Sequence, residues 1–489
     1  MYRLTSIIQF IFFLVILNIP VAAQQFTVDN SSLDTFSGGG AYDGTNILYT
    51  IMGDAQSIYG LNVQFVSSEG VPSGPRISLG KTGSGAMAAF DGENYLIVWT
   101  DEFYRMAGGD SNGFGNLYGQ FISKSGTLIG TTLTFVSNIN IKFGQGRGSI
   151  VFQDSTYFIT YLKGNDQHSD YLYRQKVDKS GNLSGTPVQI SEDYAREQSI
   201  AFDGTNYLIA WCKCDYPGND SQIYGQFVNK LGNLVGQNFL IDGSSNASDN
   251  PVNTAYDGSR YLVCFHDLAA DNSGRWNLIG RFVTSSGSVE DRFTVCDSSK
   301  NPFYASPATD GLTYLITWMQ YTDRMMLKGR YFSKTGVPLD TPFTLFDTLD
   351  GKYPVGGVGG FLNGKYLIGV NMLDNNNLNG DIYGIFLSPY VTGISKDDNS
   401  LIKTFALSQN YPNPFNPTTE ISYSVSKESF VSIKVFDILG REVRTLVNEV
   451  KSSGSFTVKF DGSRLASGVY IYKMQAGSFI SSKKLVLMK

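Results

Sequence analysis

The chain has 489 residues, which is long for one domain and favours two or more. Hydrophobic residues make up 42% of it, enough for packed cores, and its 53 glycines and 13% aromatic residues are typical of a turn-rich all-β protein. The net charge of -5 combines a tail of +6 (residues 401–489, with 12 Lys and Arg against 6 Asp and Glu) with a body of -11. The acidic body argues against nucleic acid as a partner, because phosphate binding needs a basic face.

Residues 1–23 predict a cleaved signal peptide. Arg3 supplies the positive charge, Ile7–Pro20 the apolar core and Val21–Ala23 the small residues for cleavage. A membrane anchor is the alternative, but the apolar run is short of the roughly 20 residues that a spanning helix needs. We therefore expect a protein without a membrane span once the signal peptide is removed.

Residues 24–390 carry an internal repeat of about 50 residues. AFDGTNYLIAW at Ala201–Trp211 recurs in closely similar form at Ala89–Trp99, Ala255–Phe265 and Ala308–Trp318. Asp-Gly between two β runs is the strongest short hairpin signal, and both turn residues are expected at positive φ. The repeated aspartates are Asp43, Asp91, Asp203, Asp257 and Asp310, with Asn363 as a variant and Phe152–Leu162 as a degenerate copy, which makes seven copies.

Each copy predicts four strands. A second hairpin follows a variable loop, as in IYGQFVNKLGNLVG at Ile223–Gly236. Strands such as YLIVW are apolar on both faces and must be covered on both sides, so the units are expected to be blades of a β-propeller. The N-terminal FTVDNSS (Phe26–Ser32) is similar to FTVCDSS (Phe293–Ser299), a fourth strand, and we expect it to complete the last blade. Seven blades are expected, or six if the degenerate copy forms none.

A glycine recurs inside the third strand of the units, where glycine marks a bulge or a close approach. We expect the large aromatic residue of the preceding strand, such as Trp99, to lie across it. The glycines are Gly60, Gly119, Gly225, Gly280, Gly329 and Gly384, and Arg174 takes their place in the degenerate copy.

Two of the connections in each unit, among them the loop between the second and third strands, differ from unit to unit and are expected on one face of the disc. Function commonly sits on varied loops that a rigid scaffold carries. Aromatic rings beside carboxylates suit sugar stacking or a protein hot spot, although such rings can also simply anchor their own loops. The candidate ligand-binding residues are Tyr104, Phe114, Tyr216, Trp276, Asp101 and Asp267.

Catalysis and metal binding have little support. With His168 and His266 as the two histidines, His-based catalysis or metal binding is disfavoured. We expect no cofactor and no metal site, although acidic loops such as Asp242–Asn250 could attract Ca²⁺. Loop carboxylates of a polysaccharide-active enzyme remain an alternative, and a structural adhesion component is a third. The cysteines Cys212, Cys214, Cys264 and Cys296 allow three pairings, among which the sequence does not choose.

After a polar linker at residues 391–404, residues 405–489 predict six or seven short strands and hence a small Ig-like β-sandwich. YPNPFNP, VFDILGREV and LASGVYIYKM follow one another before a Lys-rich end. The residues that mark these motifs are Tyr411, Pro412, Asn413, Pro414, Phe415, Asn416, Gly440, Arg441, Gly468 and Tyr470.

On these motifs the tail resembles the C-terminal sorting domain (type A) of type IX secretion cargo; a plain Ig-like adhesion module is the alternative. The resemblance implies the type IX secretion machinery as partner, export through the periplasm, and release or anchoring at the outer cell surface. The repeats resemble those of bacterial secreted proteins, which implies a fold but no activity. We therefore expect a monomeric secreted propeller that binds a glycan or a surface protein and is not an enzyme.

Overall fold

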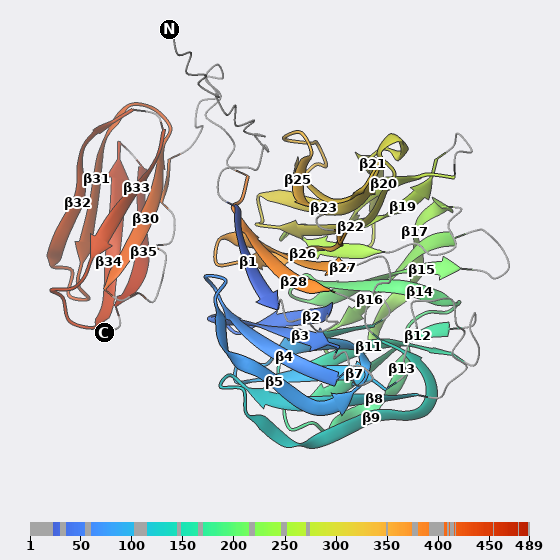
Figure 1. The fold of residues 1–489 in the computed structure, drawn as a ribbon. Helices are drawn as coiled ribbons and strands as arrows, with labels where there is room; N and C mark the ends of the chain where they lie inside the picture. The colour runs from blue at the N-terminus through green and yellow to red at the C-terminus, as the bar shows by residue number, and fades with distance from the viewer. Residues whose placement is uncertain are drawn as a thin grey trace, which may run out of the picture. The chain divides into compact units, whose positions relative to one another are not determined.

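The protein is described here by a computed structural model. It describes residues 23–29, 36–53, 60–101, 115–143, 148–164, 170–214, 221–245, 252–269, 274–348, 351–373, 380–390, 405–407, 410, 415, 417–452, 454–477 and 479–487. The predicted signal peptide up to residue 22 and the predicted linker lie outside these ranges. The chain divides into two compact units, Met1–Tyr390 and Val391–Lys489 (Figure 1). Within the described ranges, no helix has the length and apolar character needed to cross a membrane.

Unit 1 consists of antiparallel sheets whose strands follow one another in chain order. Four-stranded sheets are formed by β2 (Phe36–Tyr42), β3 (Asn46–Met52), β4 (Gly60–Ser67) and β5 (Pro72–Thr82); by β14 (Ala195–Phe202), β15 (Asn206–Cys214), β16 (Ser221–Asn229) and β17 (Leu234–Ser245); by β18 (Asn253–Tyr256), β19 (Arg260–Leu268), β20 (Trp276–Thr284) and β21 (Val289–Cys296); and by β22 (Pro302–Thr309), β23 (Thr313–Tyr321), β24 (Met325–Ser333) and β25 (Phe343–Asp347). An eight-stranded sheet contains β6 (Ser84–Phe90), β7 (Asn94–Thr100), β8 (Gly115–Ser123), β9 (Leu128–Lys142), β10 (Gly148–Gln153), β11 (Thr156–Gly164), β12 (Asp170–Asp178) and β13 (Leu183–Gln189). In it, a short pairing of β9 with β11 joins two such four-strand sets.

Both ends of unit 1 meet in its last sheet. β26 (Tyr353–Leu362), β27 (Lys365–Leu373) and β28 (Asp381–Leu387) are followed there by β1 (Ala23–Asp29). Figure 1 shows blue β1 beside orange β28. The N-terminal strand is thus the fourth strand of a sheet whose other three come from the end of the unit.

The cores of unit 1 lie between neighbouring sheets. Each sheet is covered on both faces, which explains why second strands such as β7 are buried at nearly every position. Clusters of buried side chains join Leu48 with Trp99, Leu96 with Ile159, Phe158 with Ile209, Leu208 with Val263, Leu262 with Ile316, Leu315 with Ile368, and Ile47 with Ile382. Up-and-down sheets packed face to face in this way form a β-propeller.

The repeated Asp-Gly turns differ from the predicted turn type. In Asp43-Gly44 the glycine has a φ of 93°, whereas Asp43 is not left-handed. Instead, Oδ1 of Asp43 accepts the backbone N–H groups of Thr45 and Asn46, both at 2.7 Å. The same carboxylate bonds recur at Asp91, Asp203, Asp257 and Asp310. The expected pair of left-handed residues occurs where the motif varies, at Asp154-Ser155 and Asn363-Gly364.

These turns also fasten neighbouring sheets together. The hydroxyl of Tyr261 donates to the carbonyl of Asn206 in the preceding sheet at 2.9 Å, and burial together with Asp203 raises the pKa of Tyr261. Likewise, Nζ of Lys334 in the following sheet donates to the carbonyl of Asp257 at 3.1 Å. Lys179 joins the two four-strand sets of the eight-stranded sheet in the same way, through the carbonyl of Asp91 at 2.7 Å. The repeated Asp, Tyr and Lys are therefore structural contacts between sheets.

The strand glycines make room for an aromatic residue of the fourth strand, and the prediction that the preceding Trp lies across them is wrong. A Cβ on Gly280 would lie 2.3 Å from Cζ of Phe293, and one on Gly119 would lie 2.4 Å from Cε2 of Phe135. An aromatic ring and a side chain at the glycine position cannot share this space.

Two sequence positions depart from this pattern. The first is Gly60, for which the prediction is wrong. Thr50 and Val98 are equivalent positions of the second strand; Val98 pairs with Gly119, but Thr50 pairs with Val63 rather than with Gly60. In the degenerate copy, Arg174 is paired with Val188, so a large third-strand side chain accompanies a small fourth-strand one.

Unit 2 contains two antiparallel sheets around one core. One sheet holds β29 (Ala406–Leu407), β30 (Thr418–Val425) and β33 (Gly454–Asp461), and the other holds β32 (Glu442–Lys451), β31 (Ser429–Phe436), β34 (Gly468–Ala476) and β35 (Phe479–Leu487). Ile421, Ile433 and Tyr472 lie in the core between them, as does the motif residue Phe415. Tyr411, Pro412, Asn413, Pro414 and Asn416 fall outside the described residues.

Candidate functional site

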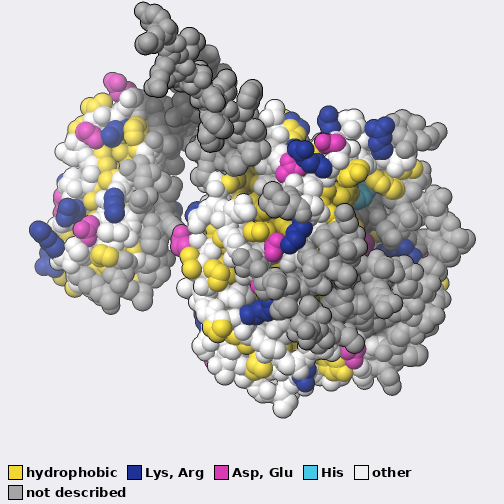
Figure 2. Space-filling model, viewed as in Figure 1, with side chains coloured by type: hydrophobic (Ala, Val, Ile, Leu, Met, Phe, Trp, Pro, Cys, Tyr) yellow, Lys and Arg dark blue, Asp and Glu magenta, His cyan; other side chains and the backbone are white. Residues whose placement is uncertain are grey.

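In each four-strand set of unit 1, an Asp-Gly turn or its variant joins the first two strands at one end of the set. At the opposite end of the strands, which we call the loop edge, the second strand runs into a variable loop. Much of the loop edge falls outside the described residues, including Tyr104, Phe114 and Tyr216. Figure 2 shows hydrophobic side chains exposed among charged ones over the sheets β18–β21 and β22–β25. The described part of the loop edge is most complete there.

Asp101 closes the base of its loop. Its Oδ1 accepts the backbone N–H of Asn116 at 2.6 Å, and its Oδ2 accepts the Asn116 side-chain amide at 2.7 Å. The carboxylate also contributes, after burial, to raising the pKa of Tyr118. Asp101 is thus placed to hold the two ends of a loop together.

Three rings meet at the loop edge of β19, β20 and β22. His266 and Trp276 have ring centroids 6.1 Å apart, and His266 and Tyr304 are also 6.1 Å apart. Phe303 packs edge-on against Tyr304, with centroids 5.7 Å apart. We call His266, Trp276 and Tyr304 the ring cluster. Trp276 is partly buried, whereas Tyr304 is 50% exposed.

Tyr304 lies in a bulge and has a left-handed backbone. The pairing of β22 with β23 shifts between Phe303 and Ser306, and Tyr304 has a φ of 56°. The residue six before the Asp of the Asp-Gly turn is also left-handed in two other units, where it is Gly85 or Glu197. A bulky residue in this conformation is uncommon and costs free energy that glycine avoids. Such strain collects at functional sites, and bulges commonly aim a side chain beside one.

His266 holds this bulge in place. Its Nε2 accepts the backbone N–H of Tyr304 at 2.8 Å, so this nitrogen carries no proton. The imidazole is buried, and burial lowers the pKa of His266 to about 4. The ring is therefore neutral near pH 7 and serves as an acceptor that positions Tyr304.

An arginine bridge lies on the other face of the sheet β18–β21, toward β17 of the preceding sheet. Arg292 binds the buried carboxylate of Asp242 through Nε at 2.8 Å and through a second guanidinium nitrogen. A third nitrogen of Arg292 lies 2.8 Å from Oδ2 of Asp267, the residue after His266. Arg281 adds a further contact to Asp242 at 2.9 Å. Burial raises the pKa of Asp267 although Arg292 opposes it.

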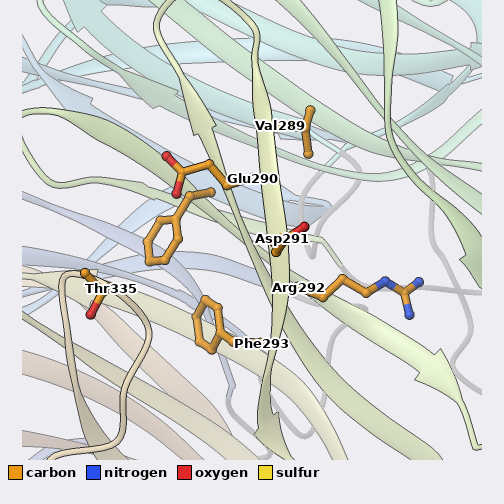
Figure 3. A pocket seen from close by; sticks show the side chains of 7 residues that line it. Val289, Glu290, Asp291, Arg292, Phe293 and Thr335 are labelled. Atoms are coloured by element: carbon orange, nitrogen blue, oxygen red, sulfur yellow. The ribbon is translucent and has the colours of Figure 1, made fainter.

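A hollow of about 480 Å³ runs along β21 and is lined by Phe282, Val289, Glu290, Asp291, Arg292, Phe293 and Thr335. Figure 3 shows Glu290 and Arg292 extending to different sides of the strand. Glu290 pairs with Arg260, Arg292 with Asp242, and Phe293 covers Gly280. These three lining side chains are thus engaged in structural contacts.

The cysteines and acidic residues that are described do not build a metal site. No group of three or more His, Cys, Asp or Glu side chains that could hold an ion occurs among the described residues. Cys264 and Cys296 are buried thiols outside any disulfide, and burial raises the pKa of Cys296 to about 12. Their surroundings make both thiols poor nucleophiles.

Of the residues selected from the sequence, Trp276 lies in the ring cluster, whereas Asp267 points to the other face of the sheet, toward Asp242 and Arg292. The sequence missed Tyr304 and His266. An alignment of the copies on their Asp-Gly turns could have pointed to Tyr304, because a tyrosine stands there at the position where another copy has Gly85. The burial of His266 and the partners of Arg292 depend on contacts between strands, for which the sequence has no comparable signal.

In the tail, side-chain hydrogen bonds fix the turn between β31 and β32. Oδ1 of Asp437 accepts the backbone N–H groups of Leu439 and Arg441, both at 3.0 Å, and Nε of Arg441 donates to Oδ2 of Asp437 at 2.7 Å. Gly440 has a φ of 78° and donates to the Asp437 carbonyl. The motif residues Gly440 and Arg441 thus fix the shape of this turn.

Comparison with protein families identifies the tail. Residues 409–488 match the secretion system C-terminal sorting domain. The tail therefore marks secreted cargo of the type IX system, which the secretion machinery recognises and delivers to the cell surface or beyond. No curated protein matches the chain.

Solved structures are similar to unit 1 at low identity. The β-propeller domain of the Trilobed protease from Pyrococcus furiosus has a TM-score of 0.44 and 9% identity, covering 74% of this chain and 98% of its own. The WD40 domain of SCAP from fission yeast has a TM-score of 0.39 and 11% identity, covering 76% and 99%. A subtype N10 neuraminidase-like protein of A/little yellow-shouldered bat/Guatemala/060/2010 has a TM-score of 0.39 and 9% identity, covering 64% of this chain and 98% of its own. The β-propeller architecture of unit 1 follows from its strand pairing.

Proposed function

We propose that this chain is a secreted, non-catalytic β-propeller that binds an extracellular glycan at the ring cluster on its loop edge. The observation that carries the proposal is Tyr304, a half-exposed ring on a left-handed backbone that His266 holds by a hydrogen bond. Trp276 supplies a second ring, whose centroid lies 6.1 Å from that of His266. Rings that offer an apolar face beside polar partners suit a sugar.

The proposed architecture is a signal peptide at 1–23, a closed seven-bladed propeller at 24–390, a linker at 391–404 and an Ig-like sorting domain at 405–489. Two four-strand sets within the eight-stranded sheet support seven blades rather than six. The clusters of buried side chains between successive four-strand sets also support seven blades. The cluster that contains Ile47 and Ile382 packs the first set of strands against the last. Passage through the periplasm and a monomeric state complete the proposal.

The test is a glycan array and a polysaccharide pull-down with the purified full chain, followed by product analysis of each retained polysaccharide. We expect retention without cleavage, lost in Tyr304→Gly. Tyr321→Gly is the matched control, because Tyr321 is similarly exposed at the end of β23 but has no part in the ring cluster. Retention that survives Tyr304→Gly would contradict the assigned site.

The other functions give different results in the same experiment. Cleavage of a retained polysaccharide would favour the polysaccharide-active enzyme over the binding module. Absence of retention would reject glycan binding and favour a protein partner or a structural surface role.

A further inference from the structure

The turn between β31 and β32 displays two aliphatic side chains to solvent. Ile438 and Leu439 are 74% and 73% exposed. The Asp437–Arg441 contacts hold the turn in one shape, so little conformational entropy is left to lose when a partner binds. A rigid, exposed aliphatic pair has the properties of an interaction hot spot.

The apolar surface continues onto the neighbouring strand. Phe436, the last residue of β31, stands opposite Ile471 of β34, and both Ile471 and Val469 are exposed large hydrophobic residues. Lys484 stands opposite Ile471 on the other side, and Lys473 lies two residues further along β34; both are exposed. We call Ile438, Leu439, Val469 and Ile471 the tip patch. It is an apolar surface with a cationic rim.

We propose that the tip patch is the surface by which the secretion machinery recognises this cargo, and that its partner is a machinery protein with an apolar pocket rimmed by carboxylates. The inference rests on the proposed export of the chain by its tail. Charge supports this partner, because the tail carries 12 Lys and Arg against 6 Asp and Glu while the body of the chain is acidic. Asp437 and Arg441 are positioning residues that present the pair.

The experiment compares full-length chains in a host with an active type IX system, measuring the fraction at the cell surface and in the medium against the fraction in the periplasm. We expect Ile438→Ser/Leu439→Ser to lower the exported fraction roughly tenfold, as for the loss of a binding hot spot. Val450→Ser/Ile480→Ser is the matched control, because these side chains are 60% and 57% exposed on the other end of the same sheet. It should export normally.

Three outcomes would overturn the proposal. Normal export of the tip variant would show that the machinery reads another surface. Equal loss in the control would show that any lost surface apolarity, rather than the tip, matters. Unchanged export after deletion of residues 407–489 would remove the export premise itself. The purified tip variant should keep the thermal unfolding midpoint of the parent chain and its glycan retention, which separates this proposal from that of the ring cluster.

Discussion

Phe26 covers Gly384 so closely that a Cβ added to the glycine would lie 2.1 Å from Cζ of the ring. The same relationship joins Phe293 to Gly280 within a sheet made of consecutive strands. The ring of Phe26 also approaches Gly70 of the first sheet, as that of Phe293 approaches Gly336 of the next. The N-terminal strand therefore reproduces the contacts of an ordinary fourth strand, although over 350 residues of sequence separate it from its partner.

Gly384→Ala is expected to lower the free energy of unfolding by about 1–3 kcal/mol, because the added methyl group overlaps the Phe26 ring. Gly369→Ala is the matched control: it lies opposite Gly384 on β27, and a Cβ there meets nothing within 4 Å. Urea unfolding of both variants measures the difference. Equal destabilisation by the two would mean that the ring and the glycine do not compete for space.

The repeat made much of the propeller predictable from sequence. Asp-Gly turns, doubly apolar strands and the similarity of Phe26–Ser32 to Phe293–Ser299 specify the strands and the pairing of β1 with β28. The prediction is wrong at Gly60: the sequence motif puts Gly60 at the glycine position of the third strand, whereas the strand pairing puts Val63 there. The register of a strand depends on its pairing with the neighbouring strand, and a repeated sequence motif does not define that pairing.

The candidate site was less predictable, for a physical reason. Trp276 and Asp267 stand near variable loops and could be selected by residue type alone. Tyr304 lies inside a strand, and its exposure follows from a bulge opposite Trp318. The Asp242–Arg292–Asp267 bridge was not predictable either. Arg292 lies 50 residues from Asp242 on β17 and 25 residues from Asp267 on β19, so the contacts depend on how these strands are arranged in space.

Protonation of His266 is expected to weaken the fold at acid pH. Burial lowers its pKa to about 4, whereas an unfolded histidine titrates near 6.5. Between these values the unfolded chain binds a proton that the folded chain does not, so the free energy of unfolding falls as pH falls below about 6.5. This amounts to about 2 kcal/mol between pH 7 and pH 5.

His266→Gln keeps an acceptor for the N–H of Tyr304 but does not titrate. Its unfolding free energy, measured by urea titration at both pH values, should fall by about 2 kcal/mol less than that of the parent chain. Asp267 and Arg292, which lie nearby, are present in both proteins and cancel in the comparison. Identical pH dependence in the two proteins would show that the imidazole is not held neutral.

Removal of Arg292 should take two guanidinium contacts from the buried Asp242 carboxylate, while the contact with Arg281 remains. We expect Arg292→Met to cost about 3 kcal/mol, because a buried charge that loses a partner is expensive. Adding Asp242→Asn should restore part of the loss, since the neutral amide needs no cation. Arg324→Met, which breaks a surface pair with Asp347, is the control and should have little effect. A loss of stability no larger than in this control would mean that the contacts which remain, including that of Arg281, compensate the charge of Asp242.

The strain at Tyr304 predicts that stability and binding respond differently to substitution. Tyr304→Gly should change the free energy of unfolding by less than about 1 kcal/mol, because relief of the left-handed backbone offsets the lost ring contacts and the added freedom of the unfolded chain. Tyr304→Val should be less stable than Tyr304→Gly by about 1–2 kcal/mol, since a β-branched residue fits this backbone poorly. Both variants remove the ring and keep the N–H that His266 accepts, so both should lose glycan retention. Urea unfolding and the pull-down, run on the same preparations, measure the two effects. If valine were as stable as glycine, the backbone at this position would not be strained, and the argument that strain marks Tyr304 as a binding residue would fail.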